Sequence, residues 1–183
     1  AATGALSFVT APDREGPADA GGDKVYDVTG LVSDGTLTDA QAIAVTVTNV
    51  NEAPVISSNG GGATASVSVA ENATAVTTVT SADVDAGAVL TYSISGVDAA
   101  LFTIDSSTGV LAFISAPNFE SPADVGGDNV YDVTVTVSDG SLTDTQAIAV
   151  TVTNVNEAPV ISSNGGGGTA AGPVGGKNQP RAV

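Results

Sequence analysis

Alternating apolar and polar residues run through most of the chain and indicate short β-strands. In residues 90–95, Leu, Tyr and Ile alternate with Thr and Ser, so the apolar side chains share one face. Residues 130–138 and 145–154 repeat this period of two and are rich in Val, Thr and Ile. Turns of Gly, Asp and Ser separate the runs. The pattern therefore predicts β-structure rather than helices.

Seven strands are expected in one stretch of about 105 residues. They are Ser66 to Ala70, Thr74 to Thr80, Val89 to Ser95, Leu101 to Asp105, Gly109 to Ile114, Val130 to Ser138 and Thr145 to Asn154. This number of short strands, without helix signals between them, predicts an all-β fold built as a two-sheet antiparallel β-sandwich.

An internal repeat organises the chain. Residues 1–64 match residues 106–169 at an offset of 105, with about three quarters of the positions identical. We therefore expect residues 1–52 to be the second half of a truncated repeat and 53–158 to be a complete repeat. Residues 159–183 would begin a further repeat and end in a flexible Gly- and Pro-rich tail. The chain reads as a fragment of a longer tandem array.

The truncated copy is expected to contain the equivalents of the last three strands. It lacks the strands that would cover its apolar face, and Gly30 stands where the complete copy has Val135. We therefore expect residues 1–48 to be poorly packed or metastable.

Composition excludes several classes of function. The 183 residues carry a net charge of −16 with no Cys and no His, which removes the common nucleophiles, the common general base and the ligands of soft metals. Between Lys24 and Lys177 there is no basic residue, so nucleic acid binding is not expected. The sequence contains no run of about 20 apolar residues, so no transmembrane segment is expected. Residues 1–4 do not resemble a secretion signal. The chain is not expected to be an enzyme.

Acidic residues gather in motifs between the apolar runs. The six-residue sequence Asn-Val-Asn-Glu-Ala-Pro occurs at 49–54 and again at 154–159, each time after an alternating run and before an extended Pro-Val-Ile segment. It reads as the joint between two β-domains. Its carboxylate and amide side chains, in a chain with almost no basic residues to pair them, favour a hard cation such as Ca²⁺ held between the domains.

These motifs, taken together and in order, resemble the cadherin repeat family in its bacterial, cadherin-like form, found in large repetitive surface adhesins. The resemblance covers nearly the whole chain apart from the tail. It rests on Ala-Glu-Asn at 70–72, Asp-Arg-Glu at 13–15, Asp-Val-Asp at 83–85, Val-Ser-Asp-Gly at 137–140 and the two joints. It implies a seven-stranded Greek-key antiparallel β-sandwich of the immunoglobulin-like, cadherin-like kind, in tandem repeats.

The resemblance also implies Ca²⁺ clamped at each junction. Its ligands at the junction at 49–54 would be Asp13, Glu15, Asn51, Glu52, Asp83, Asp85 and Asp139. At the junction at 154–159 they would be Glu71, Glu120, Asn156 and Glu157, and we expect this second site to be incomplete and weak.

The joints depart from the family pattern. Each is one residue shorter than the vertebrate linker and begins with Asn49 or Asn154 in place of Asp, and Asn118 replaces the Asp of Asp-Arg-Glu in the complete repeat. These changes favour fewer ions or lower affinity, near 10⁻⁴ to 10⁻³ M as in other extracellular modules. The family's strand-exchange tryptophan has no counterpart, so homophilic cell adhesion by that route is unsupported.

The leading hypothesis is a calcium-binding, cell-adhesion module: a rigid rod segment of a bacterial surface or secreted adhesin. It would be extracellular or held at the outer membrane through its parent protein, with neighbouring repeats and a cell-surface protein or glycan as partners. The acids could instead be strand-capping turns of a spacer that binds no metal. The chain could also be an accessory, glycan-binding sandwich of a polysaccharide-degrading enzyme, although 4 Phe and 3 Tyr supply no aromatic platform. An acid-pair glycosidase is disfavoured, because the acids lie in joints rather than across a cleft.

Overall fold

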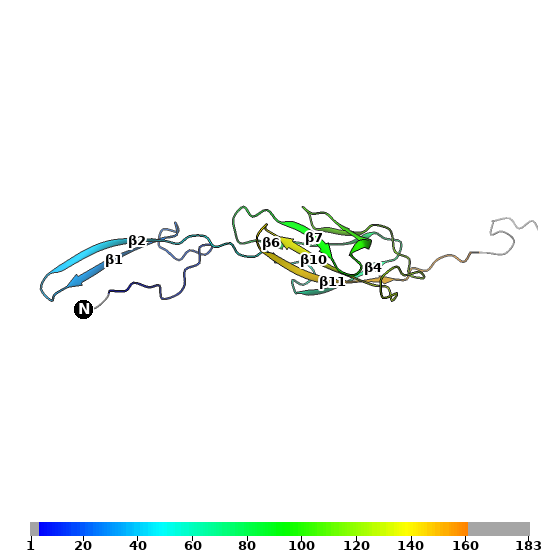
Figure 1. Ribbon diagram of the computed structural model, residues 1–183, viewed down its shortest axis with the longest axis horizontal. Helices are drawn as coiled ribbons and strands as arrows, with labels where there is room; N and C mark the ends of the chain where they lie inside the picture. Colours follow the sequence, from blue (N-terminus) through cyan, green and yellow to red (C-terminus); the bar gives the residue numbers. More distant parts are fainter. Residues whose placement is uncertain (1–3, 161–183) are drawn as a thin grey trace, which may run out of the picture.

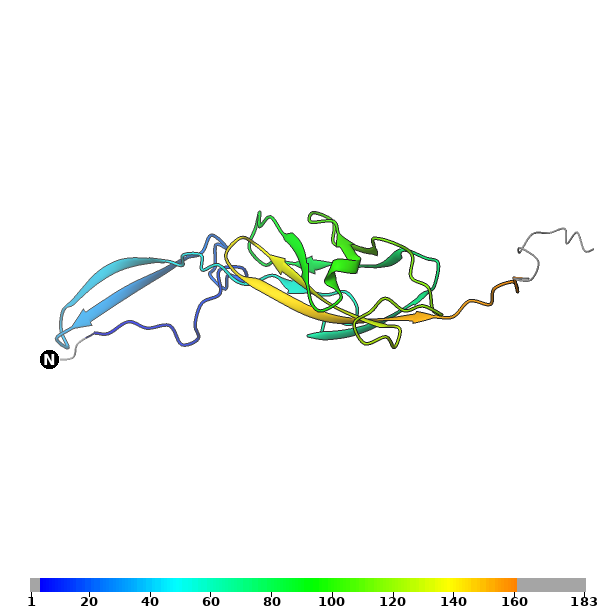
Figure 2. The ribbon, with the colours of Figure 1, turned by 45° about the vertical axis from the view of Figure 1, so that its right-hand side comes forward.

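The computed structural model describes residues 4–160 and is almost entirely β. A two-stranded hairpin projects from one end of a β-sandwich, so the two parts follow one another along one long axis (Figure 1). Figure 2 shows the same end-to-end arrangement from a second direction. Within residues 4–160 no helix is long and apolar enough to cross a membrane.

The hairpin consists of β1 (Val25–Ser33) and β2 (Thr38–Thr46), which pair antiparallel. The sandwich follows the linker at 49–54. Its elements are β3 (Val55–Ile56), β4 (Thr64–Ala70), β5 (Ala75–Thr78), β6 (Ser81–Ala82), β7 (Thr91–Ser95), a 3₁₀ turn η1 (Ala99–Leu101), β8 (Phe102–Ile104), β9 (Val110–Phe113), β10 (Val130–Ser138) and β11 (Thr143–Thr153).

Two sheets form the sandwich. One has the order β4-β11-β10-β7 and the other the order β5-β9-β8, while β3 and β6 make a short separate ladder. Neighbours are antiparallel except β4, which runs parallel to β11. The all-β sandwich and its seven principal strands are thus confirmed. The two-residue strands β3 and β6 are too short to give a sequence signal.

The core lies between the two sheets. Strands β10 and β11 supply its largest share through every second residue, the period that the sequence predicts. The buried apolar side chains are Ile56, Val69, Val79, Phe102, Leu111, Phe113, Tyr131, Val133, Val135, Val137, Ile148, Val150 and Val152. Phe113 stacks on Phe102 and meets Tyr131 edge-on, so three aromatic rings fill one end of this core.

One expected strand of the truncated copy does not form. Residues 4–9 correspond to the strand β9, yet they are irregular. In the complete repeat β9 is hydrogen-bonded between β5 and β8, and residues 4–48 contain no equivalent of either neighbour. The truncated copy therefore has two strands instead of three, because a strand needs a paired neighbour to satisfy its backbone.

The segment after the linker is fixed to β11 by one buried and one half-buried polar side chain, neither of which the sequence pattern singled out. Gln146 is fully buried, and its amide group donates to the carbonyl oxygens of Ser58 (3.2 Å) and Gly62 (2.8 Å). Asp144 accepts a hydrogen bond from the backbone N–H of Ile56 (2.8 Å). Since buried polar groups are costly to leave unpaired, these bonds hold the start of the complete repeat, and so the linker that precedes it, in a defined place.

The repeat provides a matched test of this packing. Leu111 is 0% exposed, whereas its counterpart Leu6 is 57% exposed. We expect Leu111→Ala to lower the free energy of unfolding of the complete repeat by about 2–5 kcal/mol, the range for a buried leucine. Leu6→Ala should cost much less. Urea unfolding of both variants checks this, and equal losses would contradict the assigned core.

Candidate metal centre

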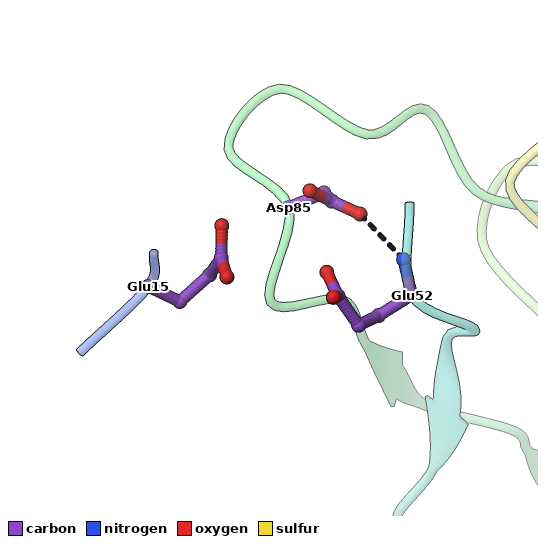
Figure 3. A group of neighbouring side chains, drawn as sticks. All are labelled: Glu15, Glu52 and Asp85. Carbon is purple, nitrogen blue, oxygen red and sulfur yellow. Dashed lines mark hydrogen bonds between the residues drawn. The ribbon is translucent and has the colours of Figure 1, made fainter. Parts of the chain in front are cut away.

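Three carboxylates converge at the junction between the hairpin and the sandwich. Glu15 comes from the loop before β1, Glu52 from the linker between β2 and β3, and Asp85 from the loop between β6 and β7. One oxygen of each lies within 4.8 Å of the others. Figure 3 shows the three side chains directed toward one another from three separate segments. The cluster therefore joins both sides of the linker.

Local turns place two of these acids. Asp13 accepts hydrogen bonds from the backbone N–H groups of Glu15 (2.9 Å) and Gly16 (3.2 Å) through Oδ1. Asp83 does the same for the N–H of Asp85 (2.8 Å), also through Oδ1. Short acidic side chains commonly form such turns with their own backbone. Each turn leaves the Oδ2 atom of its aspartate outside these bonds, and Asp83 Oδ2 is buried with no hydrogen-bond partner.

The linker binds to the sandwich through its amide groups. Asn49 donates to Asp85 Oδ1 (2.6 Å), and the backbone N–H of Glu52 donates to Asp85 Oδ2 (3.0 Å; Figure 3). Asn51 donates to Asp139 Oδ2 (2.7 Å), in the turn between β10 and β11. The two bonds to Asp85, first that from the Asn49 amide and then that from the Glu52 N–H, lower its pKa and so favour its ionised form.

Glu52 lies in an unfavourable electrostatic environment. Burial and the nearby charges of Asp85, Glu15, Asp13 and Asp83 raise its pKa. Its Oε2 atom is buried and has no hydrogen-bond partner. The basic group at this cluster is Arg14, which lies 3.7 Å from Glu15 and donates to Asn49 (2.8 Å). One guanidinium does not balance this number of carboxylates.

The residues present at this junction fit a hard divalent cation. The donors are carboxylate and amide oxygens, the ligand set that Ca²⁺ prefers. Two of the oxygens, Glu52 Oε2 and Asp83 Oδ2, are buried and unpaired, and such atoms in a folded protein require an explanation. A bound cation at the cluster of Glu15, Glu52 and Asp85 would give the Glu52 carboxylate a partner, and it would offset the burial and the repulsion that raise the pKa of Glu52.

A second carboxylate group lies at the other end of the sandwich. Oxygens of Glu71, Glu120 and Glu157 approach within 4.8 Å of one another. Glu71 is 2% exposed, and both of its oxygens are already used: the backbone N–H of Val155 (2.7 Å) and that of Phe119 (2.9 Å) donate to them. These two bonds lower the pKa of Glu71. Its first role is therefore to attach the second linker to the sandwich.

The structure brings most of the expected ligands together. At the first junction Glu15, Glu52 and Asp85 meet, while Asp13 and Asp83 lie close enough to raise the pKa of Glu52. Asn51 and Asp139 pair with each other beside this group. At the second junction Glu71, Glu120 and Glu157 meet, whereas Asn156 is exposed and makes no side-chain hydrogen bond within the described part of the chain.

Sequence reasoning missed the role of the first residue of each linker. From the sequence, Asn49 and Asn154 were interpreted only as replacements of Asp that remove one negative charge from each junction. In the structure each donates a short hydrogen bond to a junction acid: Asn49 to Asp85 and Asn154 to Glu120 (2.6 Å in both). The repetition of Asn at the same place in both linkers was the available signal.

Comparisons with known proteins identify the fold. No family model matches the chain, and a search of curated proteins finds no match. Among solved structures, mouse cadherin-23 EC22-24 is similar, with 23% identity, a TM-score of 0.57, and coverage of 80% of this chain and 46% of that one. Protocadherin gamma B7 extracellular cadherin domains 1–4 give 24% identity, a TM-score of 0.58, and coverage of 79% and 34%.

A third similar structure is the protocadherin gammaB4 extracellular domain, with 27% identity, a TM-score of 0.51, and coverage of 79% of this chain and 21% of that one. This chain spans less than half of the length of each of the three. The protein is thus an all-β chain of the sandwich class with acidic junctions. Its fold is that of the cadherin extracellular repeat.

The raised pKa of Glu52 gives a testable dependence on pH. A carboxyl group whose pKa is higher in the folded state stabilises the fold below its unfolded pKa, and this contribution is lost as the pH rises through the folded value. In metal-free buffer we therefore expect Glu52→Gln to melt at a higher temperature than the unmodified chain at pH 7, with the difference shrinking toward pH 4. Thermal unfolding followed by circular dichroism measures this. A variant less stable than the unmodified chain at pH 7 would contradict it.

Proposed function

We propose that the chain is a calcium-binding, cadherin-like segment of a bacterial surface or secreted adhesin, and that it acts as a rod stiffened by Ca²⁺ between its repeats. Residues 1–52 are the second half of one repeat, 53–158 a complete repeat, and 159–183 the start of the next with a tail. The segment works outside the cell, in series with neighbouring repeats, and the array as a whole binds a cell-surface protein or glycan.

One observation carries this proposal: Glu52, in the linker, is surrounded by acids from both repeats and has a buried oxygen without a partner. A cation at this place changes repulsion between the two sides into a shared attraction. Asp13, Glu15, Glu52, Asp83 and Asp85 would hold the ion, with Asn51 and Asp139 beside them. Because these ligands come from both sides of the linker, binding restrains the relative movement of the two repeats.

The two junctions are not equivalent in this proposal. At the second, both oxygens of Glu71 already accept backbone hydrogen bonds, and Asn118 stands where the first junction has Asp13. Glu120 and Glu157 therefore have fewer unpaired carboxylate oxygens beside them than Glu52 has at the first junction. Among the described residues Asn156 also has no hydrogen-bond acceptor that corresponds to Asp139, the partner of Asn51. We propose a main site at the first junction and a weaker, incomplete one at the second.

The ion proposed is Ca²⁺ rather than Mg²⁺. Several carboxylates of different loops give a large and irregular set of oxygen ligands, which Ca²⁺ accepts, whereas Mg²⁺ requires near-octahedral geometry and keeps its water. The Asn residues that begin each linker reduce the charge of the site, which places the affinity at about 10⁻⁴ to 10⁻³ M, typical of extracellular modules.

The test is thermal unfolding of the chain in EGTA and then in millimolar Ca²⁺, with Mg²⁺ as the control ion. An ion that binds the folded state alone stabilises it by about 1.4 kcal/mol at ten times its dissociation constant. We expect Ca²⁺ to raise the unfolding midpoint clearly and Mg²⁺ to raise it little. Coincident curves in EGTA and Ca²⁺ would leave a spacer whose acids bind no metal.

A matched pair of variants locates the site. Asp85→Asn removes one negative charge from the acidic cluster without changing the size of the side chain. Asp132→Asn makes the same change at an exposed position of β10. We expect the first to remove most of the Ca²⁺-dependent shift and the second to keep it. Equal responses of the two variants would place any bound calcium elsewhere.

A further inference from the structure

The two linkers lie at opposite ends of the sandwich, yet they lead to two strands that are direct neighbours. The linker at 49–54 leads into the segment that carries β4, and the linker at 154–159 follows β11 (Figure 1). Residues 64–70 of β4 run parallel to residues 147–153 of β11. A pull on the two linkers in opposite directions therefore acts to slide β4 along β11.

This parallel ladder is loaded all at once by such a pull. Sliding one strand along the other strains every hydrogen bond between them together, because the bonds run across the strands. Pulling the same strands apart from one end would instead break the bonds one after another. The inner face of the ladder is also closed to water, since Val69, Val150 and Val152 are 7%, 0% and 1% exposed. The ladder therefore resists a pull along the molecule more strongly than a pull across it.

Buried polar groups fasten the ladder at the end where the first linker enters. Gln146 lies on β11 just before the ladder begins, and its amide group holds the Ser58 and Gly62 carbonyl oxygens. Its own oxygen accepts a hydrogen bond from the Asn59 amide (3.2 Å), and Asn59 in turn accepts one from the Thr77 hydroxyl (3.1 Å). Tension from the first linker reaches this network before it reaches β4.

A buried carboxylate fastens the other end of the ladder. Glu71 directly follows β4, and its Oε1 atom accepts a hydrogen bond from the backbone N–H of Val155 (2.7 Å) in the second linker. The backbone N–H of Glu71 donates to the carbonyl oxygen of Thr153 (3.0 Å). The hydroxyl of Thr153 donates to the carbonyl oxygen of Val69 (3.3 Å). The end of β4 is therefore tied to the chain just after β11, where the second linker pulls.

We propose that the β4–β11 ladder, fastened by Gln146 at one end and by Glu71 at the other, carries tension through the complete repeat. This route from residues 56–62 through the ladder to Val155 is called the tension path below. That the repeat comes under tension rests on the function proposed above. The tension path itself is a property of the fold, and it needs no metal because each of its bonds joins two protein groups.

Two buried side chains separate resistance to force from overall stability. Gln146 and Leu111 are both 0% exposed, but Leu111 lies on β9, in the opposite sheet and outside the tension path. Gln146→Leu keeps an apolar side chain of similar size and leaves the carbonyl groups of Ser58 and Gly62 unpaired. Leu111→Ala removes core contacts that are still in place when β4 begins to slide.

The experiment is single-molecule force spectroscopy of the full chain in EGTA. The chain has no Cys, so handles can be attached through Ala53→Cys and Ala158→Cys, two exposed positions that load the ladder along its length. A second pair of exposed positions, Ala63→Cys and Thr145→Cys, pulls the same two strands apart from one end. We expect the complete repeat to unfold at a clearly higher force with the first pair than with the second.

The variants are compared with the first pair of handles at constant force, where the unfolding rate is the measured quantity. Gln146→Leu should unfold at least about tenfold faster, the factor that loss of paired buried polar groups provides. Leu111→Ala should unfold under force at nearly the rate of the unmodified chain, although its thermal midpoint is lower. Absence of Ca²⁺ binding would contradict the proposed function but would leave these measurements unaffected.

Equal unfolding forces for the two pairs of handles would overturn the proposal. So would an equal rise in the unfolding rate for Gln146→Leu and Leu111→Ala, because resistance to force would then follow overall stability. Where Gln146→Leu does not fold by circular dichroism, Thr77→Val replaces it, since this change removes only the hydroxyl that holds Asn59. Faster unfolding of Thr77→Val under force then supports the tension path, and an unchanged rate overturns it.

Discussion

The structure depends on negative charge concentrated at the linker. Glu52 lies between two bodies that each bring acids to it, and burial together with the repulsion from these acids raises its pKa. Hydrogen bonds from Asn49, from Asn51 and from the backbone of Glu52 to Asp85 and Asp139 hold the junction together. These bonds neutralise no charge. The junction is therefore closed by amide groups but electrostatically incomplete, which is the physical basis for the cation that we propose.

The internal repeat shows how much the sandwich depends on its second half. The two hairpins have nearly the same sequence and the same register, and each has an edge-on Phe–Tyr pair. Each is also preceded by a turn in which an aspartate, Asp19 or Asp124, accepts a hydrogen bond from a backbone N–H four residues later. These local features need neighbours close in sequence. Burial and the third strand at residues 4–9 need residues from a distant segment, and they are lost where that segment is missing. Local sequence specifies the hairpin, and long-range packing stabilises it.

Much of this could be predicted from the sequence. The period of two in residues 130–138 and 145–154 placed β10 and β11 closely, because each strand is long and half its side chains are buried. The gathering of Glu15, Glu52 and Asp85 was implied by the resemblance to the cadherin repeat, to which the order of the motifs pointed. Two kinds of feature could not be predicted. Strands of two residues such as β3 have no periodicity, and the pairing of Gln146 with the Ser58 and Gly62 carbonyl groups depends on tertiary geometry alone.

The most direct test of the account measures the junction itself. The chain has no Cys, so nitroxide labels can be attached selectively to Thr29→Cys on β1 and Thr145→Cys on β11, both exposed positions on either side of the linker. Pulsed electron resonance then gives the distribution of label distances. The account predicts a broad distribution in EGTA that narrows in millimolar Ca²⁺ and stays broad when Asp85→Asn is added. The same distribution in EGTA and in Ca²⁺ would contradict it.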